Sequence, residues 1–330
     1  MKIKNPTIKK ILNKINWHYL VLSVFILVIF IAMSVQSKHF MTLANMEILI
    51  NNFIMEAIMA LGMTMVIISG GSDISISGIL PFTAITFAYM MLGNVPVALA
   101  AVAAIIVGGL IGLINNELRR LLNIHPMIVT MATQLTLKGL NLAITGGSVV
   151  AGFSEDFQKI GGFKPLGLSL AIWAYIVLAV FYVLFSRNNR LFLNVYFVGG
   201  NKDAATLSGM NAERVLRFVY VASGLLAGLA GVLSTTVYNS ASYSFGQNVE
   251  MKVITAVAIG GTSMTHGGEG SICGTLLGTL FMALIYNAFV MSGISTYYQD
   301  VFTGSMLVVA VLLSEGVRAI KAKSALQAEA

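Results

Sequence analysis

The residues best suited to chemistry in this sequence stand where glycine-rich stretches interrupt apolar segments. Residues 69–75, SGGSDIS, contain Asp73, the most notable acid within an apolar segment. An ionisable residue in such a place is a functional hypothesis by default. Asp73 can also cap the helix that begins at Ile74, with help from Ser75. We favour capping, which is compatible with a position beside a transport path. A proton relay is disfavoured, because no His or second acid is obviously placed as a partner.

A second glycine-rich stretch, residues 260–271 (GGTSMTHGGEGS), raises the question of phosphate binding. No lysine or strand pattern accompanies these glycines, so the case is weak, and His266 is better explained as a loop histidine than as a ligand or base. The sequence has no HExxH, no Cys/His cluster, no nucleophile elbow and no GxxxxGK[ST] phosphate loop. It therefore predicts no catalytic residue, no metal site and no ATPase activity in this chain.

Neutral amides also recur within the apolar segments. They can line a path for a hydroxyl-rich solute or join helices by hydrogen bonds, and joining is the commoner use. Glu56, in the second apolar segment, is less easily explained than Glu47, which fits a helix start. The candidate residues for a translocation path are Asn51, Asn52, Gly70, Gly71, Asp73, Ser75, Gln134, Asn141 and Asn287.

The elements that must position these residues are membrane helices. The chain has 330 residues, of which 57% are hydrophobic and 10% are charged, against about 25% charged in a soluble domain. Long apolar runs without a period of two predict helices. The expected fold class is an all-α polytopic membrane protein with about ten transmembrane segments, two of them interrupted by glycine-rich breaks. These segments lie near residues 17–35, 46–69, 74–92, 96–115, 126–144, 167–186, 215–236, 252–261, 271–291 and 298–314, the eighth being too short to span conventionally.

The distribution of Lys and Arg predicts the orientation. With the N-terminus in the cytoplasm, fifteen of these residues fall on the cytoplasmic side and four on the other, a clear positive-inside bias. The net charge of +7 is thus explained by topology rather than by nucleic-acid binding. We expect one transmembrane domain, residues 1–330, with cytoplasmic segments at 1–16, 187–214 and 315–330. Residues 145–166 and 237–252 are expected outside.

Close helix packing is predicted at three glycine pairs with small-xxx-small spacing. The pairs are Gly108 and Gly112, Gly224 and Gly228, and Gly274 and Gly278.

A short polar helix is predicted at residues 200–209. Asn201 fits an N-cap, Asp203 lies in the first turn, and Gly209 fits the left-handed position after the helix. Ala204, Ala205 and Leu207 give the helix a shallow apolar side. It is either a capped loop on the membrane surface or a docking helix for a cytoplasmic partner; the residues alone leave these alternatives nearly even.

Three ordered motifs carry a family resemblance. Residues 196–233, YFVGGNKDAATLSGMNAERVLRFVYVASGLLAGLAGVL, resemble the cytoplasmic coupling segment and following helix of monosaccharide-type permeases of ATP-binding cassette (ABC) importers. SGGSDISISG at 69–78 and AVAIGGTSMTHGGEGSICGTLLG at 256–278 extend the likeness over nearly the whole chain. The second loop departs from the family spacing by one extra residue near Thr265 and His266, so no residue roles are transferred across that loop.

The resemblance implies a permease subunit in a bacterial inner membrane, forming the path for a monosaccharide or similar small polar solute. Its implied partners are an ABC ATPase subunit, a periplasmic or lipid-anchored solute-binding protein, and a second permease copy or a homologous permease. ATP and Mg would bind the ATPase, and no cofactor would bind this chain. The alternatives are an ion-coupled secondary transporter and, less favoured, a membrane-embedded enzyme. The implied ATPase-coupling residues are Gly200, Asn201, Asp203, Ala204, Ala205, Leu207, Ser208 and Gly209.

Overall fold

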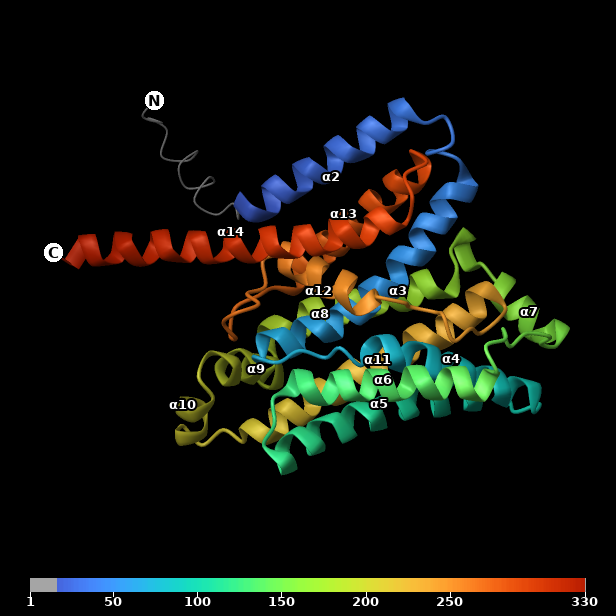
Figure 1. The fold of residues 1–330 in the computed structure, drawn as a ribbon, viewed down its shortest axis with the longest axis horizontal. Helices are drawn as coiled ribbons and strands as arrows, with labels where there is room; N and C mark the ends of the chain where they lie inside the picture. Colours follow the sequence, from blue (N-terminus) through green and yellow to red (C-terminus); the bar gives the residue numbers. More distant parts are fainter. Residues whose placement is uncertain (1–16, 330) are drawn as a thin grey trace.

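The computed structural model describes residues 17–329, and within them the chain is built from helices and their connections (Figure 1). In this range an isolated antiparallel bridge between Val150 and Ala241 is the sole pairing of strand type. The predicted all-α fold class is therefore confirmed for the described residues. The predicted cytoplasmic segment 1–16 lies outside them.

Each predicted apolar segment contains a helix. The first half of the chain forms α2 (Trp17–Gln36), α3 (Leu43–Ile68), α4 (Ile76–Leu92), α5 (Val97–Leu122), α6 (Pro126–Thr145) and the short α7 (Glu155–Gly162). A 3₁₀ turn, η1 (Pro165–Gly167), leads into α8 (Leu170–Asn188), α9 (Arg190–Gly200) and α10 (Lys202–Leu207). The chain then forms α11 (Ala212–Tyr238), α12 (Val249–Ile259), α13 (Ile272–Met291) and α14 (Tyr297–Glu329).

Fewer than ten helices of the described residues qualify as candidate membrane spans, and the predicted count of ten is not confirmed. Among the described residues, seven helices are long and apolar enough to cross a membrane, and an eighth crossing results if α8 and α9, which meet at 69°, form one broken span. Helix α4 has 17 residues, at the lower limit for crossing a membrane, and α12 has 11, which agrees with the prediction that this segment is too short to span. The glycine-rich stretches next to them leave less chain for a continuous helix than hydropathy alone suggests.

Glycines allow the closest helix contacts, as their spacing predicted. A side chain at Gly108 of α5 would overlap the carbonyl oxygen of Gly224 of α11, and one at Gly112 would overlap that of Tyr220. On the other side of the molecule, a side chain at Gly274 of α13 would overlap the carbonyl oxygen of Gly260 at the end of α12. These contacts bring helix backbones together without a hydrophobic driving force, which is weak between apolar helices in lipid.

Two helices form the centre of the molecule. Most residues of α3 and α11 are buried, whereas α2 and α14 lie at the periphery with mostly exposed side chains. Figure 1 shows α10, the start of α2 and the end of α14 on one side of the molecule, at the left, and α7 on the opposite side. The predicted coupling segment and the predicted outer loop are thus separated by the length of the helices.

Candidate functional site

Asp73 lies in the stretch between α3 and α4 and is fully buried. Its Oδ1 accepts hydrogen bonds from the Ser75 backbone N–H at 3.1 Å and from Ser75 Oγ at 2.5 Å, and its Oδ2 accepts one from Ser223 Oγ at 2.7 Å. The acid therefore satisfies backbone and side-chain donors at the start of α4 and joins it to α11. Helix α4 begins at Ile76 with Ser75 at the N-cap position, so Asp73 supports the helix start from two residues before that position, close to the capping role that the sequence favoured.

Other polar groups complete the connection around Asp73. Asn115 of α5 donates to Ser75 Oγ at 2.8 Å and accepts from Thr133 of α6 at 2.6 Å. Tyr220 of α11 donates to the Ser72 carbonyl oxygen at 3.4 Å. A break in a helix within a bilayer is tolerated where protein groups satisfy the freed backbone. This network supplies such groups from three helices.

Two of the predicted path amides join α6 to its neighbours. Gln134 Nε2 donates to Ser77 Oγ of α4 and to Glu250 Oε1 of α12, both at 2.7 Å, and Asn141 Nδ2 donates to the Gly78 carbonyl oxygen at 3.3 Å. The side chains of Gln134, Asn141 and Glu250 are all buried. Glu250 was expected in an exposed outer loop, and that expectation is wrong, because the residue begins α12 and points into this contact.

The remaining predicted amides lie on α3 and α13. Asn45 and Asn287 exchange two hydrogen bonds, at 3.1 and 2.8 Å, and so join α3 to α13. Asn52 Oδ1 accepts a hydrogen bond from Tyr238 of α11 at 2.8 Å. Asn51 is partly buried on α3. Of the predicted path residues, Asn52 and Asn287 are brought together at one cavity, whereas Gly70, Gly71, Asp73, Ser75, Gln134 and Asn141 lie elsewhere.

That cavity has a volume of about 580 Å³ and lies between α3, α11, α12, α13 and the start of α14. The volume is within the range of about 300–1,000 Å³ typical of small-molecule sites. The helix segments around it are the first half of α3 and the ends of α11 and α13, so it opens on the side of the molecule away from α10 (Figure 1). Its polar lining comprises Asn45, Asn52, Glu56, Ser234, Tyr238, Ser244, Gln247, Lys252, Tyr286, Asn287, Thr296 and Gln299.

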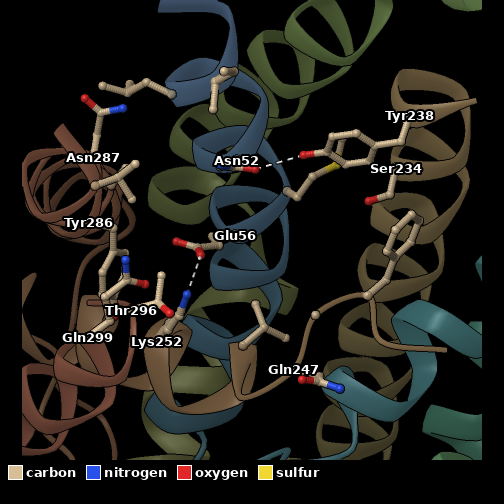
Figure 2. Close-up of a pocket in the computed structure, with 18 of the residues that line it drawn as sticks. Asn52, Glu56, Ser234, Tyr238, Gln247, Lys252, Tyr286, Asn287, Thr296 and Gln299 are labelled. Carbon is tan, nitrogen blue, oxygen red and sulfur yellow. Dashed lines mark hydrogen bonds and ion pairs between the residues drawn. The ribbon is translucent and has the colours of Figure 1, made fainter. Parts of the chain in front are cut away.

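An acid and a base face each other in this cavity (Figure 2). Glu56 Oε1 of α3 lies 3.9 Å from Lys252 Nζ of α12, and both side chains are about four-fifths buried, with exposures of 18% and 21%. Lys252 Nζ also lies 4.4 Å from the centre of the Tyr286 ring, a cation–π arrangement. Lys252 was expected in an exposed loop, and its partnership with Glu56 was missed, because 196 positions of sequence separate the two residues.

The short helix α10 has the predicted caps. Asn201 Oδ1 accepts a hydrogen bond from the Ala204 N–H at 2.9 Å, and Gly209 has the left-handed φ of +83°. Ala205 is buried, whereas Leu207 is 90% exposed. The six-residue helix is held at one face and presents its largest apolar side chain to the surroundings.

Ion pairs fix α10 to the ends of two long helices. Glu213 at the start of α11 contacts Arg119 of α5 at 2.6 Å and Lys202 of α10 at 2.7 Å. In a second cluster, Glu117 of α5 contacts Arg217 of α11 at 2.7 Å. Single exposed ion pairs contribute little, but a network of several charges orients the elements that carry it. Through Glu213, the position of α10 depends on that of α5 and α11.

A second contact joins the end of α9, which precedes α10, to the end of α3 and to the second glycine-rich stretch. We call it the glycine joint; it comprises Gly199, Gly267, Gly268 and the carbonyl group of Ile68. Gly268 N–H donates to the Ile68 carbonyl oxygen at 2.7 Å. A side chain at Gly199 would overlap this same oxygen, and one at Gly267 would overlap the carbonyl oxygen of Gly199. Each of the three segments carries a Gly–Gly pair in the sequence, at 70–71, 199–200 and 267–268, but their meeting was not predicted.

No group of three or more His, Cys, Asp or Glu residues is placed to hold a metal ion within residues 17–329. The polar groups of the cavity are instead of the kinds that bind hydroxyl and amide groups of small solutes.

Comparison with known proteins identifies the family. Residues 45–311 match the family described as branched-chain amino acid transport system / permease component. The chain belongs to this family of permease components. The ribose import permease protein of Escherichia coli strain K12 is 34% identical over 294 residues, which cover 87% of this chain and 91% of that protein. The corresponding protein of Bacillus subtilis strain 168 is 35% identical over 295 residues, covering 88% and 90%.

Permease components for other sugars are similar to a comparable degree. The D-allose transport system permease protein of E. coli K12 is 32% identical over 292 residues, covering 88% of this chain and 89% of its own length. No solved structure gives a significant match. The predicted resemblance to ABC-importer permeases is confirmed by these relatives, and an ion-coupled secondary transporter is correspondingly disfavoured.

Proposed function

We propose that this permease component forms the membrane path of an ABC importer for a monosaccharide or similar small polyol, and that α10 is the helix through which a separate ATPase drives it. The side carrying α10 is cytoplasmic in this proposal, and the cavity side faces outward, where a solute-binding protein delivers the solute. Figure 1 places α10 and α7 on opposite sides, as this orientation requires. The positive-inside distribution of Lys and Arg supports the same orientation.

The observation that carries the coupling role is the combination of anchoring and exposure at α10. Glu213 joins the helix to α5 and α11, and the glycine joint holds the end of the preceding helix, α9, against the end of α3. Leu207 nevertheless projects from it with 90% of its surface exposed. An exposed apolar side chain on a short polar helix is more stable in an apolar groove of a partner protein than in water. A partner that moves α10 would also move α5 and α11, because Glu213 joins α10 to both of these helices.

The choice of a sugar over an amino acid is supported by the relatives named for ribose, allose and arabinose. It is supported as well by the neutral amide and hydroxyl groups of the cavity, each of which can bond a solute hydroxyl. The two interruptions, at 69–75 and 260–271, would place polar groups within the membrane as in other transporters with broken helices. We propose that the path includes Asn52 and Asn287 at the cavity.

The test is uptake by an importer reconstituted in proteoliposomes from this chain, its cognate ATPase and its cognate solute-binding protein. We expect ATP-dependent accumulation of labelled pentose or hexose and none of labelled leucine. Omission of the ATPase should abolish uptake. Accumulation of leucine but of no sugar would reject the solute class, and accumulation driven by an ion gradient without ATP would reject the ABC mechanism.

A further inference from the structure

Glu56 and Lys252 lie close together in the cavity without forming a direct hydrogen bond. The 3.9 Å between Glu56 Oε1 and Lys252 Nζ exceeds the range of about 2.7–3.2 Å for a hydrogen bond. The Tyr286 ring, 4.4 Å from the ammonium group, makes a cation–π contact that restrains the position of Lys252. The carboxylate and the ammonium group therefore stand beside each other with capacity to bond a third group (Figure 2).

The pair makes the cavity electrically neutral. Among the residues lining it, all of which are described, Glu56 and Lys252 are those that carry a formal charge, and the other polar groups are amides, hydroxyls and phenols. The nearby acid Asp300 accepts a hydrogen bond from Asn248 and is not part of the lining. Removal of either charge would leave the other without a counter-charge in a mostly buried place, which is strongly unfavourable unless a solute supplies it.

A hydroxyl group fits between the two charges. It can accept a hydrogen bond from the ammonium group and donate one to the carboxylate, and a sugar offers adjacent hydroxyls that do both. A sugar acid would be attracted by Lys252 and repelled by Glu56, so nothing would offset the loss of its hydration. An amino sugar meets the same difficulty with the signs reversed.

We infer that Glu56 and Lys252 are specificity-determining residues that admit uncharged polyhydroxy solutes and disfavour sugar acids and amino sugars. This inference rests on the permease function proposed above. It concerns selection within the membrane path, after a solute-binding protein has made its own choice.

Charged thiol reagents measure the electrostatics of the cavity without a transported solute. Ser244 lines the cavity and is exposed, so Ser244→Cys in a Cys273→Ala chain provides a single reporter. The rates of modification by a sulfonate-bearing and a trimethylammonium-bearing methanethiosulfonate are compared as a ratio. We expect Glu56→Gln to shift the ratio toward the anionic reagent by about tenfold, the effect of one uncompensated unit charge a few ångströms away. Lys252→Gln should shift it oppositely, and the double variant should restore the parent ratio.

A matched reporter separates a local effect from a general one. Ser148 is exposed on the connection between α6 and α7, outside the cavity lining. In the Ser148→Cys chain, Glu56→Gln should leave the ratio unchanged. Equal shifts at both reporters, or no shift at Ser244→Cys, would overturn the inference.

Competition then tests selectivity directly in the reconstituted importer. D-ribonate should inhibit D-ribose uptake about tenfold more strongly in the Glu56→Gln importer than in the parent. The same solute-binding protein is present in both, so a difference is due to the permease. Equal inhibition would overturn the inference while leaving the permease function intact. Absence of ATP-driven ribose uptake in the parent, with the thiol ratios shifting as expected, would instead reject the proposed function and retain the neutral cavity.

Discussion

Replacement of Leu207 by aspartate is the most direct test of the coupling role of α10. Because Leu207 is 90% exposed, the substitution removes few contacts within the chain. Surface substitutions of this kind change folding stability by about 0.5 kcal/mol or less. The Asn201 cap, the Glu213 ion pairs and the Gly209 turn do not involve the leucine side chain. We therefore expect normal insertion and normal abundance in the membrane.

The effect on ATPase binding should be large. Burial of a leucine in a partner groove contributes about 1.5–3 kcal/mol. An aspartate in the same groove loses that contribution and adds about 1–3 kcal/mol for a polar group without a partner. The sum, about 2.5–6 kcal/mol, corresponds to a loss of roughly 60-fold to 20,000-fold in affinity.

The assay is co-purification of the cognate ATPase with the tagged permease, followed by ATP-dependent uptake in proteoliposomes. A matched control is Leu166→Asp, since Leu166 in η1 is 87% exposed and lies beside α7 on the opposite side of the molecule. The control should bind the ATPase as the parent does. Full ATPase binding and uptake by the Leu207→Asp permease would refute the argument and return α10 to an ordinary capped loop.

Three further outcomes are expected. Gly199→Ala should lower the melting temperature or the abundance of the permease, because the added Cβ would overlap a backbone oxygen in the glycine joint. Gly200→Ala is the control, since the space around Gly200 is open and the substitution should have no such effect. Equal melting temperatures of the two variants would contradict the close contact at Gly199. Asp73→Asn, which preserves a capping side chain, should retain most uptake, while Asp73→Ala should destabilise the protein by about 2–4 kcal/mol in thermal or denaturant unfolding; loss of uptake by a stable Asp73→Asn permease would show a role beyond capping. An impermeant thiol reagent should modify cysteine at Ser148 but not at Ser208 in intact cells whose outer membrane is permeabilised, and the reverse pattern would invert the proposed orientation.

Local features of this molecule could be predicted because they depend on neighbours in the chain. The Asn201 cap joins residues three apart, and the left-handed turn at Gly209 depends on the lack of a side chain at that residue. The capping role of Asp73 was favoured for the same reason, since Ser75 stands two positions later. The family could be predicted as well, because its motifs are short, ordered and continuous in sequence.

The span count and the cavity were harder to predict for physical reasons. Apolar residues suit both lipid and the interior of a helix bundle, so hydropathy marks a helix without saying whether it crosses the membrane or which face is buried. Helix α4 is apolar in this way, and its 17 residues are at the lower limit for a membrane-spanning helix. Glu250 likewise looked like a residue of an outer loop and lies buried against Gln134.

The sequence by itself determined the helical class, the family, the capped helix at 200–209 and the glycines that let helices touch. Each of these follows from composition or from residues within a few positions of one another. Only the tertiary structure placed Glu56 beside Lys252 and brought Gly199 against the end of α3 and the second glycine-rich stretch. Those contacts join helices that are far apart in the chain, and their register is set by how whole helices pack, which no local pattern of apolar residues specifies.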